Sequence, residues 1–107
     1  MTPTLTVALL QLRAFDLADH EQAWSELLRR IDDAAAERPR LIVAPEASYP
    51  AAVLGSRDAF ADMRTRGDAE VLATLGERAR RHGCYIAAGL VLRDAFGVPQ
   101  NAAVLLS

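Results

Sequence analysis

One carboxylate in this sequence stands where chemistry is commonly done. In RLIVAPEASYP, residues 40–50, the apolar run Leu41–Ala44 leads directly into Pro45 and Glu46. Such a short apolar run indicates a buried strand, and the proline ends it because it lacks a backbone donor. In open α/β sheets, ligands gather beyond the carboxyl ends of the strands. Position alone gives Glu46 two interpretations: a general base, or a structural carboxylate that caps a helix or pairs with an arginine.

The only cysteine, Cys84, is interpreted as a buried strand residue and not as a nucleophile. It follows RRHG at the start of an apolar segment, and free cysteine is commonly buried as a small hydrophobe. His82 is two positions away, but extended residues at this spacing share only a face, and no third orienting group is apparent. We interpret His82 as a C-terminal helix residue that interacts with the helix dipole.

The loop after Glu46 is a candidate for substrate binding. Residues 45–66 contain two prolines, Gly55 and scattered charges, with at most a short helix at Asp58–Arg64. Structureless segments of this length are uncommon in compact domains unless they line a site. Tyr49 lies in this loop and is a candidate substrate-binding residue, because functional residues favour loops on rigid scaffolds.

The elements that must position Glu46 form a βαβ unit. Residues 4–12 are aliphatic and too short for an ordinary helix, so they predict a buried strand. A helix follows, in which Asp19 and Gln22 resemble a capping box and Pro39 marks the exit. The strand at residues 40–44 comes next, and two parallel strands need such a helical crossover.

The second half of the chain predicts one helix and two strands. Asp68 is the expected cap of a helix that ends at RARRHG, where cations and a glycine suit a C-terminus. The segments CYIAAGLVLR and NAAVLLS then read as strands, and the short connection DAFGVPQ predicts an antiparallel hairpin. The sequence stops inside the last strand, so we expect a fragment.

Composition excludes several classes of function. The 107 residues, 51% apolar and 24% charged, suit one core-forming domain. A net charge of −2 gives no reason to expect nucleic acid or an anionic membrane as partner. With one cysteine and neither a signal peptide nor a membrane-spanning run, no intrachain disulfide forms and a soluble cytoplasmic protein is expected.

Five segments together resemble the nitrilase superfamily of carbon–nitrogen hydrolases. In order and spacing they match the opening strand that ends in glutamine, the first helix, the Pro-Glu motif, the next helix and strand, and the Asn-containing strand. The segments are TVALLQL, HEQAWSELLRRIDDAAAE, RLIVAPEASYP, LGERARRHGCYIAAGLVLR and NAAVLLS. The resemblance implies an α/β fold, the four-layer α-β-β-α sandwich. Residues 1–107 would supply the amino-terminal part of a single hydrolase domain, in the order β-α-β-(loop)-α-β-β.

The resemblance also implies a mechanism. The family uses a Glu-Lys-Cys triad on small amides, carbamoyl compounds or nitriles, without metal or organic cofactor, and commonly forms homo-oligomers. Glu46 is the implied general base. All twelve basic residues here are arginine, and the family's lysine and nucleophilic cysteine lie farther along than Ser107. We therefore expect no turnover from this chain alone.

Two other functions remain open. A non-catalytic remnant or interaction module would keep the α/β scaffold and associate with a partner through uncovered apolar sheet surface. A flavodoxin-like or other small α/β binding domain is less compatible with the antiparallel hairpin that ends the chain.

Overall fold

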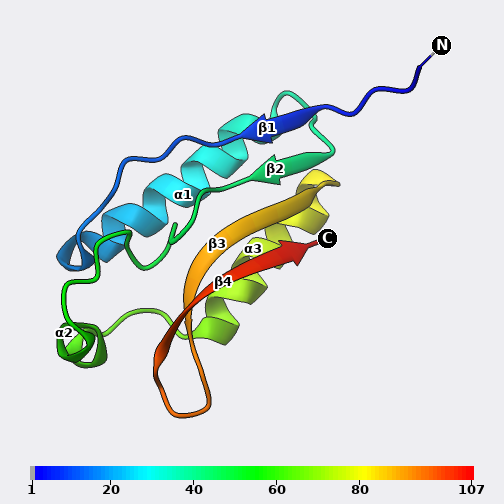
Figure 1. The fold of residues 1–107 in the computed structure, drawn as a ribbon. Helices are drawn as coiled ribbons and strands as arrows, with labels where there is room; N and C mark the ends of the chain where they lie inside the picture. Colours follow the sequence, from blue (N-terminus) through cyan, green and yellow to red (C-terminus); the bar gives the residue numbers. More distant parts are fainter. Residues whose placement is uncertain (1) are drawn as a thin grey trace.

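A computed structural model describes residues 2–107, apart from the side chains of residues 57, 61 and 62. It contains one four-stranded sheet in the order β1-β2-β3-β4 (Figure 1). The strands are β1 (Val7–Leu9), β2 (Leu41–Val43), β3 (Tyr85–Arg93) and β4 (Pro99–Leu106). The helices are a 3-10 turn η1 (Leu17–Asp19), α1 (His20–Ala35), α2 (Arg57–Asp62) and α3 (Asp68–His82).

This element order confirms the predicted fold class. Strands β1, β2 and β3 are parallel, and β4 returns antiparallel to β3, as the short hairpin connection predicted. Both crossovers step across the sheet in the same direction, and such crossovers are almost always right-handed. For this reason α1 and α3 pack on the same face of the sheet (Figure 1).

The helix-covered face holds the core. Residues at helical spacing on α1 and α3 meet the side chains that point toward them from β2, β3 and β4. The side chains of Leu27, Ile31, Ile42, Leu75 and Ile86 are fully buried there. Burial of each such side chain contributes about 1.5–3 kcal/mol, so this layer supplies much of the stability.

The opposite face of the sheet is largely apolar and open over β1, β2 and the first part of β3, whereas Val91 near the end of β3 is covered by Leu17, Ala51 and Phe60. The strand register places two cross-strand rows on it: Val7, Leu41 and Tyr85, and then Leu9, Val43, Ala87 and Leu105. Leu9 is 73% exposed and Leu105 is 66% exposed. Contiguous apolar surface of this kind marks an interaction site or a surface that another layer covers.

The two predicted helix caps have different outcomes. Asp19 occupies the N-cap position of α1 as predicted, but its side chain makes no cap hydrogen bond, because its backbone (φ −101°, ψ 24°) lies outside the extended region that a capping residue normally adopts. Asp68 is the first residue of α3, with Gly67 at the cap position. The Asp68 carboxylate instead accepts a hydrogen bond of 2.8 Å from the backbone N–H of Arg93, which ties α3 to the end of β3.

Two element boundaries also differ from the prediction. The first strand is shorter than residues 4–12, because it pairs only with the three residues of β2. The short helix lies at Arg57–Asp62, where the Ser56 hydroxyl accepts a hydrogen bond of 3.0 Å from the Ala59 N–H. Within residues 2–107, no helix has both the length and the apolar character needed to cross a bilayer.

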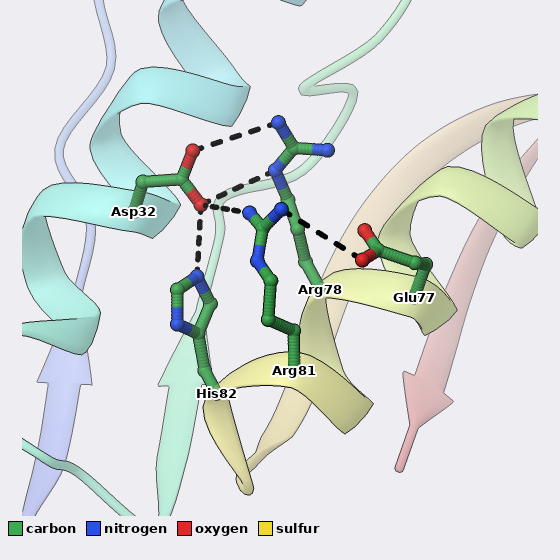
Figure 2. A network of polar contacts seen from close by, with 5 residues as sticks. All are labelled: Asp32, Glu77, Arg78, Arg81 and His82. Atoms are coloured by element: carbon green, nitrogen blue, oxygen red, sulfur yellow. Dashed lines mark hydrogen bonds and ion pairs between the residues drawn. The ribbon is translucent and has the colours of Figure 1, made fainter.

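A polar network joins the outer surfaces of α1 and α3 (Figure 2). One oxygen of Asp32 lies 3.2 Å from Nε of Arg78, 3.2 Å from Nη2 of Arg81 and 2.9 Å from Nε2 of His82. Arg81 also pairs with Glu77 at 3.7 Å. His82 is the last residue of α3, as predicted, but its described side-chain partner is this carboxylate.

The network changes the titration of Asp32. Partial burial disfavours the ionised carboxylate, but the hydrogen bond with His82 and the charges of Arg78 and Arg81 outweigh this effect. The pKa of Asp32 is therefore lowered from its usual value. A lowered pKa in the folded state means that the carboxylate stabilises the fold only while it is ionised.

We expect Asp32→Asn to lower the free energy of unfolding by about 1 kcal/mol at pH 7, a modest effect because solvent screens a partly exposed pair. The loss should shrink as the pH falls from about 5 through the folded pKa, since the wild-type carboxylate is then protonated as well. Urea unfolding between pH 3 and 7 measures this. Asp33→Asn is the control, because its side chain is 66% exposed. A pH-independent difference between wild type and Asp32→Asn would contradict the assignment.

Candidate active site

A bulge after β2 interrupts its pairing with β3. The backbone N–H of Ala44 donates to the Ala87 carbonyl at 2.8 Å, and the N–H of Ser48 donates to the Gly89 carbonyl at 2.8 Å. Between these two hydrogen bonds the segment after β2 runs from residue 44 to residue 48, whereas β3 runs only from residue 87 to residue 89. The surplus residues must leave the ladder, and residues 45–47 do so. The predicted general base is the middle residue of this bulge.

The local sequence explains the shape of the bulge. Pro45 has no N–H to donate, so the ladder stops there, as predicted. Ala47 has a φ of 51°, in the left-handed region that costs a residue other than glycine about 1–2 kcal/mol. The Ser48 hydroxyl offsets part of this cost by donating to the Pro45 carbonyl at 2.5 Å. Sequence reasoning gave Ser48 no role, although a serine three residues after a strand-ending proline signals such a turn.

The side chain of Glu46 is exposed and borders a hollow of about 420 Å³ on the open face of the sheet. The floor of the hollow is made mainly of small or apolar residues: Val43, Ala87, Gly89 and Ala103. Asn101 from β4 adds a carboxamide to the same hollow. A mostly apolar hollow with few polar groups is the usual form of a small-molecule site.

A second, smaller hollow of about 90 Å³ also touches Glu46. Arg13 and Phe15 contribute to it from the segment after β1, and the Arg13 guanidinium lies 4.5 Å from the centroid of the Phe15 ring. No role in the site was predicted for this segment. This segment borders Glu46 because parallel β1 and β2 end at the same edge of the sheet.

Tyr49 is a packing residue in this structure. Its side chain is 2% exposed, and its ring meets that of Trp24 edge-on with the centroids 4.9 Å apart. Its hydroxyl accepts a hydrogen bond of 2.8 Å from the backbone N–H of Arg66. Because of these contacts, the Tyr49 side chain does not line the hollows that the described residues form at Glu46. It links the start of the loop at residues 45–66 to α1 and to the end of the loop at Arg66. Direct contact with substrate, as predicted from the sequence, has no support in this placement.

Cys84 lies away from Glu46. Its side chain is 6% exposed and belongs to the core beneath α3. Burial raises the pKa of its thiol, which keeps the thiol protonated and unreactive at neutral pH. This placement agrees with the interpretation of Cys84 as a buried structural residue.

Comparison with known proteins decides the family. Residues 6–107 match the family model described as carbon-nitrogen hydrolase. The chain belongs to this family. Its fold is similar to that in the crystal structure of the C. elegans NitFhit protein, with a TM-score of 0.76 and 21% sequence identity. The match covers 94% of this chain and 24% of that chain, so this chain spans about a quarter of the structure it matches. No protein of curated function matches the sequence.

Membership of the carbon–nitrogen hydrolase family confirms the resemblance to an amino-terminal portion of the nitrilase superfamily. The four-stranded sheet with its helices is the corresponding part of a nitrilase-type fold. Hydrolysis is the general activity of carbon–nitrogen hydrolases. Within residues 2–107, the Glu46 carboxylate lies beside an apolar hollow, beyond the ends of the parallel strands.

The packing role of Tyr49 is testable by removing one oxygen. We expect Tyr49→Phe to lower the free energy of unfolding by about 1–3 kcal/mol, because the Arg66 N–H loses its partner in a poorly hydrated position. Tyr85→Phe is the matched control, since the Tyr85 side chain is 46% exposed, and should change stability by less than about 0.5 kcal/mol. Equal stability of the two variants in chemical denaturation would argue against the anchoring role.

Proposed function

We propose that residues 1–107 form the amino-terminal part of a single nitrilase-like hydrolase domain. The reaction is hydrolysis of a non-peptide C–N bond in a small amide, carbamoyl compound or nitrile. The observation that carries this proposal is the placement of Glu46 on a bulge at the carboxyl edge of the parallel strands, exposed beside an apolar hollow. Family membership supports hydrolase chemistry, and the geometry supports Glu46 as its base.

In the proposed mechanism, Glu46 takes the proton of a cysteine thiol. The thiolate then attacks the nitrile or amide carbon, and the electron pair displaced from the multiple bond is stabilised by a lysine ammonium group. For an amide, the protonated Glu46 returns its proton to the departing nitrogen, and loss of ammonia or an amine leaves a thioester, which water hydrolyses to the acid. For a nitrile, attack gives a thioimidate, which takes up the proton at nitrogen and is then hydrolysed by water. We assign the thiol and the lysine to polypeptide beyond Ser107, because the sequence contains no lysine and Cys84 is buried.

The open face of the sheet has a place in the same proposal. Its two apolar rows suit a second sheet packed about 10 Å away, which would complete an α-β-β-α sandwich. We propose that such a sheet brings the thiol and the lysine to the hollow beside Glu46. No metal or organic cofactor is needed for these steps. In its complete form we expect a cytoplasmic homo-oligomer.

The test uses the product of the whole reading frame that encodes these residues, assayed with small amides, carbamoyl compounds and nitriles. We expect Glu46→Gln to lower kcat by about 10²–10⁴-fold, because the thiol loses its general base. Glu37→Gln is the control, since Glu37 is an exposed carboxylate next to the end of α1. The isolated 107-residue chain should show no turnover. Full activity in a folded Glu46→Gln variant would refute the role of Glu46.

A second candidate function rests on the open sheet face itself. An interaction module would use its exposed apolar side chains to bind a partner and would not need the carboxylate of Glu46. Four large apolar side chains of the strands are exposed on this face: Val7, Leu9, Tyr85 and Leu105. Contiguous exposed apolar surface favours association.

Association through this face has a direct measurement. We expect the isolated chain to elute in size-exclusion chromatography as a species larger than a monomer, and Leu9→Ser with Leu105→Ser to shift it toward monomer. Phe96→Ser is the control, because Phe96 is 91% exposed in the turn between β3 and β4, away from the face. A wild-type chain that stays a monomer and unfolds cooperatively would count against this candidate.

A further inference from the structure

The bulge that carries Glu46 lies directly on a glycine. We propose that Gly89 and Ser48 are positioning residues that set where the Glu46 carboxylate stands, an inference that rests on the proposed role of Glu46 as base. Neither residue needs to touch substrate. Gly89 acts by leaving room beneath the bulge, and Ser48 acts by holding the bulge down.

The space above Gly89 is filled by the backbone of the bulge. A Cβ atom added at Gly89 would lie 2.5 Å from Cα of Glu46, 2.7 Å from the carbonyl oxygen of Pro45 and 3.0 Å from the backbone nitrogen of Glu46. All three atoms are main-chain atoms, so no side-chain rotation relieves the contact. Any residue with a Cβ must therefore move the Pro45–Glu46 peptide.

Gly89 is unlike the other glycines of the chain. At Gly55, Gly67, Gly83 and Gly97, an added Cβ would meet nothing within 4 Å. At Gly76, in α3, it would meet only the end of the flexible Arg80 side chain at 3.5 Å, an ordinary contact. Gly89 is thus the one glycine whose lack of a side chain is needed for space.

The neighbours of Gly89 on the open face show that the strand itself does not require glycine. Ala87 lies two residues earlier on β3, and Ala103 faces Gly89 across the β3–β4 pair. Both carry a Cβ on the same face of the sheet. The requirement is therefore local to the place where the bulge crosses β3.

Ser48 holds the bulge from its other end. Its N–H donates to the Gly89 carbonyl at 2.8 Å, and its hydroxyl donates to the Pro45 carbonyl at 2.5 Å. The Ser48 side chain is buried, so water competes poorly for these bonds. The backbone of Pro45 and Glu46 is thereby fixed between the sheet below and the Ser48 hydroxyl, and this sets the point from which the Glu46 side chain extends.

Catalysis is sensitive to this fixation. An added Cβ at 2.5 Å needs about 1 Å of further separation to reach an ordinary contact. A displacement of about 1 Å between reacting groups costs about 100-fold in rate. Substrate affinity should change little, because the bulge backbone is only one part of the lining of the hollow.

The test compares Gly89→Ala, Ser48→Ala, Gly76→Ala and Glu46→Gln in the product of the whole reading frame. We expect kcat of Gly89→Ala to fall about 100-fold with KM within about threefold, since only the placement of the base changes. Ser48→Ala should lose about five- to tenfold in kcat, the effect of one hydrogen bond. Gly76→Ala should keep wild-type kcat and a melting temperature that is equal or higher, because alanine suits a helix interior.

A second measurement needs no activity. In NMR spectra of the 107-residue chain, Gly89→Ala should shift the amide signals of residues 46–48 and speed hydrogen exchange at Ser48, whereas Gly76→Ala should affect only α3. Wild-type kcat in folded Gly89→Ala, or unchanged exchange at Ser48, would overturn the inference. If Gly89→Ala does not fold, wild-type kcat in Ser48→Ala overturns it instead. Full activity in Glu46→Gln rejects the proposed base, and the positioning role falls with it.

Discussion

The fold depends on the buried pairing of β2 with its two parallel neighbours. Only three residues of β2 take part, yet they fix the places of β1 and β3, and the Ile42 side chain at their centre is fully buried. A shift of register by one residue would exchange the helix-covered face of the sheet for the open one. The same pairing determines where the chain leaves the sheet at Pro45. It therefore positions both the core side chains and the bulge that carries Glu46.

Sequence patterns predicted the elements where burial and spacing are local properties. The helices α1 and α3, the strand before Pro45 and the glycine that ends α3 were all predicted from neighbouring residues. The predicted cap at Asp68 was wrong, because an aspartate side chain serves either the nearest helix end or a distant backbone group. For Asp68 the distant group is the N–H of Arg93, 25 residues away, and nothing near Asp68 in the sequence signals it.

The site shows the same division. Pro45 and Glu46 were identified from a strand ending and a family motif, both of which are visible in one stretch of sequence. The bulge was not predicted, because it depends on which residue of β3 lies beneath it. The anchoring contacts of Tyr49 were also hidden, since Trp24 and Arg66 approach it from a helix and a loop that lie well apart in the chain. The prediction for Tyr49 rested on its place in a loop, whereas its side chain packs in the core.

The bulge places Glu46 on the face of the sheet that carries the exposed apolar rows. The same water therefore hydrates the Glu46 carboxylate and the exposed apolar side chains of the sheet. While the face is bare, water solvates the carboxylate and weakens its interaction with any proton donor that approaches. A second layer packed on the apolar rows would also exclude water from Glu46. Electrostatic interactions are much stronger in a site without water. Under the proposed role of Glu46 as general base, covering this face of the sheet would also strengthen the interaction of the carboxylate with its proton donor.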